Sequence, residues 1–331
     1  MQMFLSVILV SFPGQNALAQ DNKVEEISDF VFSELPRQII EKLPDGLVED
    51  IKTKSDLGAV IEIGGLTNDN LSIDDIDLST GNSDVAAKAS VLLSYDQGIG
   101  DKLNFGVSYK GSQTLYQDFT DFDFQSHLLT AEADYKIKKY KVGVIYRNAD
   151  STLAGDDFLK LTQVSPFVSS FVGEKTFIRA AYAYSDKDFD SAENRSAREH
   201  QGRVDAYYFL NGTRQYVILG YALEHSNAQG DPFDFLSNRV RLSYVHKFKL
   251  GPKRVKLGAS WSYELRDFEN LTPSINAVRE DDRHRGRVNL EVPINKSLYS
   301  RIEYKREMNS SNLSSADFNR NTVSFTLGLK L

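Results

Sequence analysis

The stretch Asn321-Thr-Val-Ser-Phe-Thr-Leu-Gly-Leu-Lys-Leu331 decides the fold class of this chain. Its residues alternate strictly between apolar and polar or small: Val323, Phe325, Leu327, Leu329 and Leu331 against Ser324, Thr326, Gly328 and Lys330. Because successive side chains of a β-strand point to opposite faces, this period of two predicts a strand with one apolar and one polar face.

The same alternation recurs upstream in about fourteen segments between Leu57 and Leu331. The clearest of these segments are residues 103–109, 129–137, 140–146, 239–248 and 254–265. The segment from Leu159 to Phe171 contains Pro166, a residue that is uncommon inside sheets, and it is included on its apolar pattern. The sequence therefore predicts an all-β fold in which nearly every strand has one apolar face.

Tight turns and longer polar stretches alternate between these segments. The tight turns are Gly98-Ile99-Gly100, Lys138-Lys139, Gly173-Glu174-Lys175, Asn211-Gly212, Gly251-Pro252 and Asn295-Lys296. Short turns at one end and long loops at the other are typical of a transmembrane antiparallel β-barrel in the outer membrane of a Gram-negative bacterium. We therefore expect about fourteen strands, with both chain ends in the periplasm.

The composition agrees with a barrel and excludes other classes. Residues of the hydrophobic type make up 41% of the 331 residues, yet no run is long and apolar enough for a spanning helix, and the mean hydropathy is -0.38. A net charge of -7 argues against nucleic-acid binding. Tyrosines near the strand ends favour an interfacial girdle over a soluble sandwich: Tyr95, Tyr109, Tyr135, Tyr146, Tyr184, Tyr244, Tyr263 and Tyr304.

The first residues predict an export signal and a short helical segment. The apolar run Met3 to Val10, followed by Ala17-Leu18-Ala19, predicts a signal peptide over residues 1–19. Apolar residues at spacings of three and four then predict helical structure within residues 20–56, placed in the periplasm or plugging the barrel, which itself occupies 57–331. A docking role for this segment is the alternative.

In a membrane barrel the polar faces of the strands line the lumen. The charged residues expected there are Arg239, Arg241, Lys247, Arg254, Lys256, Glu264, Arg266, Arg283, Arg285, Arg287, Glu291, Arg301, Glu303 and Lys305. Rows of opposite sign on neighbouring strands can satisfy one another structurally. They can also provide a path for an anionic solute or for a polypeptide in transit. About fourteen strands leave room for a partly occluded aqueous lumen.

Five aspartates crowd one long connection: Asp69, Asp74, Asp75, Asp77 and Asp84. We expect a solvated charged loop there, with divalent-cation bridging to lipopolysaccharide as the alternative. The expected partners are outer-membrane lipids and lipopolysaccharide, with a lipoprotein client or a small polar solute.

No catalytic or cofactor motif stands out. The chain has five histidines, and the pairs Glu199-His200 and Glu224-His225 are expected at outer-loop edges, where a hydrolase site would be possible but solvated charge is favoured. Metal-ligand spacings and phosphate-binding glycine motifs do not appear in the sequence. We therefore expect no enzyme activity, no catalytic residues, no metal and no cofactor.

The last hairpin, REMNSSNLSSADFNRNTVSFTLGLKL (306–331), has a Ser/Asn-rich loop, Phe318 and then Arg320-Asn321 before the closing strand. The first has Gly64-Gly65 followed by Thr67-Asn68-Asp69-Asn70. Both resemble the barrel domain of the surface lipoprotein assembly modifier family. Members of that family carry a tetratricopeptide-repeat domain before the barrel, where this sequence has only residues 20–56, and they end in an aromatic residue where this chain has Leu331.

The resemblance implies a barrel of about fourteen strands that assists surface display of lipoproteins. The leading functional hypothesis is accordingly an outer-membrane transport barrel. The alternatives are a porin-like passive channel for small polar or anionic solutes and a structural or adhesive barrel acting through its acidic loops.

Overall fold

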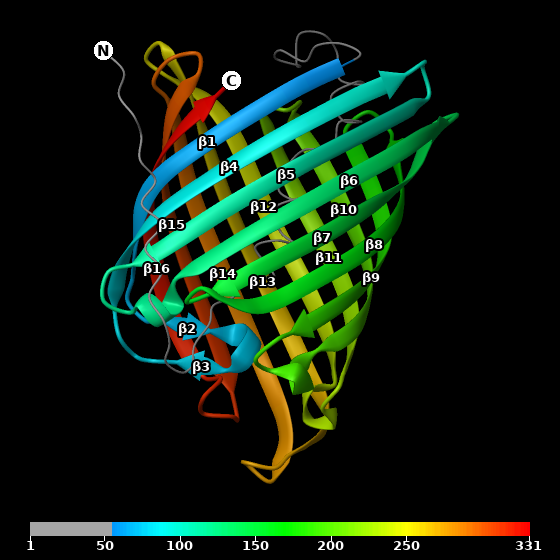
Figure 1. Ribbon diagram of the computed structural model, residues 1–331. Coiled ribbons are helices and arrows are strands. Elements are labelled where there is room, and N and C mark those ends of the chain that lie inside the picture. Colours follow the sequence, from blue (N-terminus) through cyan, green and yellow to red (C-terminus); the bar gives the residue numbers. More distant parts are fainter. Residues whose placement is uncertain (1–54) are drawn as a thin grey trace.

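The computed structural model describes residues 55–331, which form a closed antiparallel barrel of fourteen strands (Figure 1). The predicted signal peptide (1–19) lies outside the described residues, as does the predicted helical segment except for Ser55 and Asp56, which begin the first strand. Among the described residues no helix is long and apolar enough to cross a membrane.

The barrel strands follow one another around the wall in chain order, and the last closes on the first. The register places Val60 opposite Lys330 and Asn68 opposite Thr322. The strands are β1 (Ser55–Asn68), β4 (Asp84–Ile99), β5 (Leu103–Tyr116), β6 (Phe124–Ile137), β7 (Tyr140–Leu153), β8 (Asp156–Val172), β9 (Thr176–Phe189), β10 (Ala197–Asn211), β11 (Gln215–Ala228), β12 (Phe235–Leu250), β13 (Lys253–Thr272), β14 (Ala277–Pro293), β15 (Leu298–Ser311) and β16 (Phe318–Lys330). The predicted all-β barrel is confirmed, and the Pro166 segment is the strand β8.

The six predicted tight turns all join consecutive strands, at the barrel end where β16 finishes. At the other end, named the outer end after the predicted orientation, the connections hold short elements: β2 (Ser72–Ile73), η1 (Asp74–Ile76), β3 (Leu78–Ser79), η2 (Thr120–Phe122), η3 (Glu193–Arg195) and η4 (Asp231–Phe233). One expected long loop is wrong: β7 and β8 are joined there by the two residues Ala154-Gly155, both with positive φ. The polar sequence in that region continues the strands instead of leaving them.

The outer surface of the barrel carries the apolar side chains. Trp261 is 44% exposed and Phe325 is 48% exposed, and Leu257 on the same face is partly exposed. Exposed large apolar residues occur on every strand of the wall, which a water-soluble surface does not show. All eight tyrosines predicted for a girdle share this face by strand parity. The exterior is therefore that of a transmembrane barrel facing lipid.

The inner face is less polar than the alternation suggested, because three apolar clusters lie on it. One cluster, around Phe158 and Leu161, occupies the outer end of β6 to β9. Another, around Phe177 and Tyr207, occupies the tight-turn end of β8 to β12. The third joins Leu71 and Ile73 of the first outer loop to the wall. Side chains of neighbouring strands touch across the concave inner wall, so these rings cover one another instead of facing water.

Tyr299 and Gly328 close the seam of β15, β16 and β1. The Tyr299 ring lies over Gly328, where a Cβ atom would come within 2.1 Å of the ring carbon Cζ. The Tyr299 hydroxyl donates a hydrogen bond to Glu62 of β1. Only glycine at position 328 leaves room for a ring that ties the last two strands to the first.

Candidate functional site

The lumen of the barrel is built around buried carboxylates, each surrounded by arginines from neighbouring strands. Glu264 of β13 is 1% exposed and accepts hydrogen bonds from Arg239 at 3.0 Å and Arg266 at 3.1 Å. Arg285 of β14 lies 3.5 Å from the same carboxylate. Alternation places these side chains on the inner face, and the register sets Arg239 opposite Glu264.

Two further carboxylates repeat this arrangement along the wall. Asp205 of β10 accepts hydrogen bonds from Arg203 at 2.8 Å and from Arg241 at 3.1 Å. Glu307 of β15 accepts one from Arg320 at 2.9 Å and lies 3.1 Å from the Lys305 ammonium. A chain of ion pairs therefore runs around the wall from β10 to β16.

Most of the fourteen residues predicted for the lumen occur in this network or next to it. Arg301 pairs with Glu291 at 3.3 Å, Arg287 lies 3.9 Å from Glu303, and Arg283 lies 3.3 Å from Asp281. Three of the predicted cations, Lys247, Arg254 and Lys256, lie instead toward the tight-turn end, where Arg254 and Lys256 are exposed. The sequence list omitted inward residues such as Arg203, Glu307 and Arg320, although the same period of two would have included them.

The first outer loop, residues 69–83, folds into the mouth of the barrel, at the end opposite the C-terminus of β16 (Figure 1). Leu71 and Ile73 are fully buried, and the Ser72 carbonyl accepts a hydrogen bond from Arg320 of β16 at 2.8 Å. These contacts fix the base of the loop to the wall beside β1. The tip of the loop, at Asp77, extends across the mouth.

Two arginines from separate parts of the barrel hold Asp77. Arg279 of β14 donates to both carboxylate oxygens at 2.8 Å, and Arg195 of η3 donates at 2.5 Å. Arg195 also donates to the Asp75 carbonyl at 3.0 Å. In the closed ring of strands the β9–β10 connection that carries η3 lies across from β1, so the loop bridges the mouth.

The aspartate loop is solvated only in part: Asp69 is exposed, as the composition of the loop suggested, whereas two of the other aspartates are buried. Asp77 is 7% exposed, and Asp84 is buried and accepts hydrogen bonds from the backbone N–H groups of Asp118 and Phe119. Burial alone would raise the pKa of Asp77, but the two arginine charges and their hydrogen bonds outweigh it and lower the pKa below the usual 3.8. Asp77 is thus held as a carboxylate anion at neutral pH.

Phenylalanine rings contact three of the mouth arginines. The guanidinium carbons lie over the rings of Phe233, Phe235 and Phe268. The distances to the ring centres are 4.2 Å for Arg195, 4.1 Å for Arg266 and 4.4 Å for Arg279. Stacked guanidiniums direct their N–H edges sideways, in the orientation that binds a planar carboxylate.

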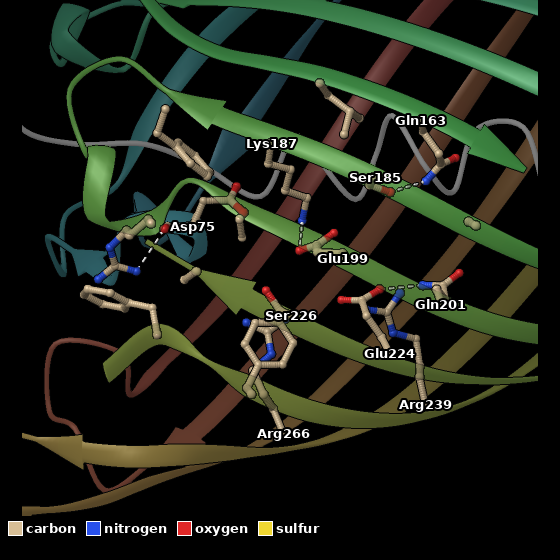
Figure 2. Close-up of a pocket in the computed structure, with 18 of the residues that line it drawn as sticks. Asp75, Gln163, Ser185, Lys187, Glu199, Gln201, Glu224, Ser226, Arg239 and Arg266 are labelled. Atoms are coloured by element: carbon tan, nitrogen blue, oxygen red, sulfur yellow. Dashed lines mark hydrogen bonds and ion pairs between the residues drawn. The ribbon is translucent and has the colours of Figure 1, made fainter. Parts of the chain in front are cut away.

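A cavity of about 120 Å³ lies inside the barrel beneath the loop tip, lined by β8 to β14. Figure 2 shows Lys187 pointing to Glu199 and Gln201 pointing to Glu224 on neighbouring strands, with Arg239 and Arg266 beside them. The lining of this cavity includes seven arginines and lysines against four aspartates and glutamates. A second cavity, next to Arg320 and Lys305, has four cations against two carboxylates. The inner surface is therefore positive in a chain whose net charge is negative.

The histidines lie on the other face of the wall. His200 is exposed on the outside of β10 and contacts the Tyr182 hydroxyl at 2.5 Å, whereas the neighbouring Glu199 points inward to Lys187. His225 is also outside and lies 3.2 Å from Glu269. Each Glu-His dipeptide considered for a hydrolase is thus split between the two faces. Within residues 55–331 no group of three or more acidic or histidine side chains is arranged to hold a metal ion.

A scan against protein-family models finds no match, and a search of curated proteins finds no relative. The resemblance to the surface lipoprotein assembly modifier family therefore rests on the two hairpins alone.

Several solved outer-membrane proteins are similar to this chain. OmpT of Vibrio cholerae is 10% identical, with 86% of this chain and 100% of that chain covered and a TM-score of 0.49. An anion-selective porin from Comamonas acidovorans is 10% identical, with coverages of 84% and 99% and a TM-score of 0.48. OprD of Pseudomonas aeruginosa is 9% identical, with coverages of 84% and 95% and a TM-score of 0.43. These likenesses concern the fold.

Proposed function

We propose that this protein is a channel of the Gram-negative outer membrane that passes small anionic solutes. The observation that carries the proposal is the excess of cations on the inner wall, seven against four in the cavity beneath the loop tip. The barrel is placed with the tight turns and the end of β16 in the periplasm and the long connections outside. No chemical step is required of it.

A positive lumen favours anions because the field of its charges is strengthened by the low-dielectric wall. The buried carboxylates Asp205 and Glu264 lie behind the arginines that pair with them. A solute entering the cavity meets more cationic than anionic side chains, because the lining carboxylates Asp75, Asp77, Glu199 and Glu224 are fewer than the seven lining arginines and lysines. Asp205 and Glu264 keep their arginines in position without lining the cavity themselves.

The loop bridging the mouth limits what can pass. Its base is buried against the wall and its tip is held by arginines, and the cavity beneath the tip is small, at about 120 Å³. Such a mouth suits small solutes better than a polypeptide. Assistance to lipoprotein display, which the resemblance implies, is supported only by the hairpin sequences. A role in lipoprotein display predicts that deletion of the gene removes lipoproteins from the cell surface. Surface labelling measures this loss.

The test is the ion selectivity of the refolded barrel in a planar bilayer under a salt gradient. We expect a reversal potential of anion-selective sign. The substitution Arg266→Gln, which removes a cation of the cavity wall, reduces this selectivity. The control is Arg198→Gln, the same change on the exposed outer face of β10, which leaves it unchanged.

A cation-selective wild type, or equal effects of Arg266→Gln and Arg198→Gln, would contradict the proposal. A folded barrel that passes no current would support the structural or adhesive alternative instead.

A further inference from the structure

The tip of the first outer loop carries an anion into a site that is shaped for one. Arg279 donates two hydrogen bonds to the Asp77 carboxylate, and Arg195 donates a third from across the mouth. Paired N–H bonds to both carboxylate oxygens are the strongest geometry that proteins use for this group. The two arginines thus form a carboxylate-binding site made of parts that are distant in the sequence.

The arginines are held in place by groups other than Asp77. Arg279 stacks on Phe268 and donates to Asp281 of its own strand at 2.8 Å and 2.7 Å. Arg195 stacks on Phe233. If Asp77 moved away, Phe268 and Asp281 would still hold Arg279, and Phe233 would still hold Arg195, so both guanidiniums keep contacts that the loop does not supply.

The loop tip, by contrast, is adapted to deliver its carboxylate. Asp77 has φ of 54°, a left-handed conformation that L-residues other than Asn and Asp adopt at a cost of about 1 kcal/mol. Its buried anchors, Leu71 and Ile73, lie at the base of the loop, where β2 pairs with β3. The tip itself is held by the two arginines and by Ile76, which packs against the apolar clusters of the wall, so release of Asp77 displaces Ile76 while the base remains in place.

We propose that Asp77 is a built-in competitor, and that small carboxylate solutes displace it from Arg195 and Arg279 to open the mouth. This inference deepens the proposed channel and rests on it for its physiological meaning. The cavity beneath the tip, with Arg239, Arg266 and Arg283 in its lining, receives the released solute. A carboxylate is favoured over a spherical anion because the fork geometry matches two oxygens in one plane.

The competition has a measurable size. A site occupied by its own ligand in about nine molecules of ten binds an outside ligand about tenfold more weakly than the vacant site. The substitution Asp77→Asn keeps the shape of the tip and its tolerance of the left-handed conformation but removes the charge. We expect succinate to bind the refolded Asp77→Asn barrel at least about tenfold more tightly than the wild type in a calorimetric titration.

Three controls accompany the titration. Asp77→Asn combined with Arg279→Gln abolishes succinate binding. Asp121→Asn, the same change on an exposed residue of the neighbouring outer connection, leaves the wild-type affinity unchanged. The uncharged 1,4-butanediol does not bind. Equal succinate affinity of folded wild type and folded Asp77→Asn, or no binding to either, would overturn the inference.

A second measurement uses the wild-type tip and does not depend on the folding of Asp77→Asn. The chain has no cysteine, and Ile76 packs between the two apolar clusters of the outer end. In the variant Ile76→Cys, succinate accelerates maleimide labelling and butanediol does not. Unchanged labelling at saturating succinate would overturn the proposal. Both measurements report binding, so an absence of bilayer current would contradict the channel function without affecting them.

Discussion

Replacing Glu264 by glutamine tests whether the carboxylates of the inner wall hold the barrel together. The substitution removes one negative charge and preserves the size of the side chain. It leaves Arg239, Arg266 and Arg285, which lie 3.0, 3.1 and 3.5 Å from the carboxylate, facing one another on the inner wall. Removing one partner of a buried ion pair costs roughly 3–5 kcal/mol. The glutamine oxygen can still accept one hydrogen bond, so we expect about 3 kcal/mol of lost unfolding free energy.

The matched control is Glu269→Gln on the same strand. Glu269 points outward, is 47% exposed in its side chain and lies 3.2 Å from His225, so its loss costs about 0–1 kcal/mol. Urea unfolding of the refolded barrel in lipid vesicles compares the two, with Trp261 fluorescence as the signal. With a slope of about 2 kcal/mol per molar urea, Glu264→Gln lowers the midpoint by about 1.5 M. Equal midpoints for the two variants would refute the idea that the inner carboxylates organise the wall.

Three further predictions concern the mouth, the lipid face and the seam. The pKa of Asp77 in the folded protein lies below the usual 3.8, so the ionised side chain stabilises the fold at neutral pH and this stabilisation is lost as the pH falls through the lowered pKa. The difference in unfolding free energy between the wild type and Asp77→Asn therefore vanishes in acid, which urea unfolding at a series of pH values measures. Phe325→Arg, which places a charge in lipid, costs about 2–4 kcal/mol, whereas Ser324→Arg on the inner face costs less than about 1, measured by the same urea titration. Gly328→Ala forces the covering ring aside and costs about 1–3 kcal/mol, while Gly286→Ala, where a Cβ meets nothing within 4 Å, changes stability by less than about 0.5; the temperature at which folded barrel is lost on a semi-native gel distinguishes them.

The sequence alone was sufficient to predict the strands that form the wall of the barrel. Alternation in a stretch such as 321–331 is imposed residue by residue, because a strand with lipid on one side and water on the other tolerates few exceptions. Four of the tight turns also follow from local chemistry, since glycine permits the positive φ found at Gly100, Gly173, Gly212 and Gly251. The strand positions could therefore be read directly, and the face of each side chain follows from them by alternation.

The mouth could not be read in this way. Asp77, Arg195 and Arg279 lie far apart in the chain, and each looks like an ordinary loop charge until the closed barrel brings them together. A cluster of aspartates has the same composition whether it is solvated or folded inward. The inner apolar clusters were missed for a related reason. A single phenylalanine on the otherwise polar face of a strand does not show that other apolar residues lie next to it on the neighbouring strands.

The most direct test of the central claim uses the single tryptophan of the chain, Trp261, which is 44% exposed on the outer face of β13. The refolded protein in vesicles is compared with and without brominated lipids, and with aqueous iodide. We predict a blue-shifted emission that brominated acyl chains quench strongly and iodide quenches little. Emission typical of water, quenched by iodide and indifferent to brominated lipid, would contradict an apolar surface that faces the membrane.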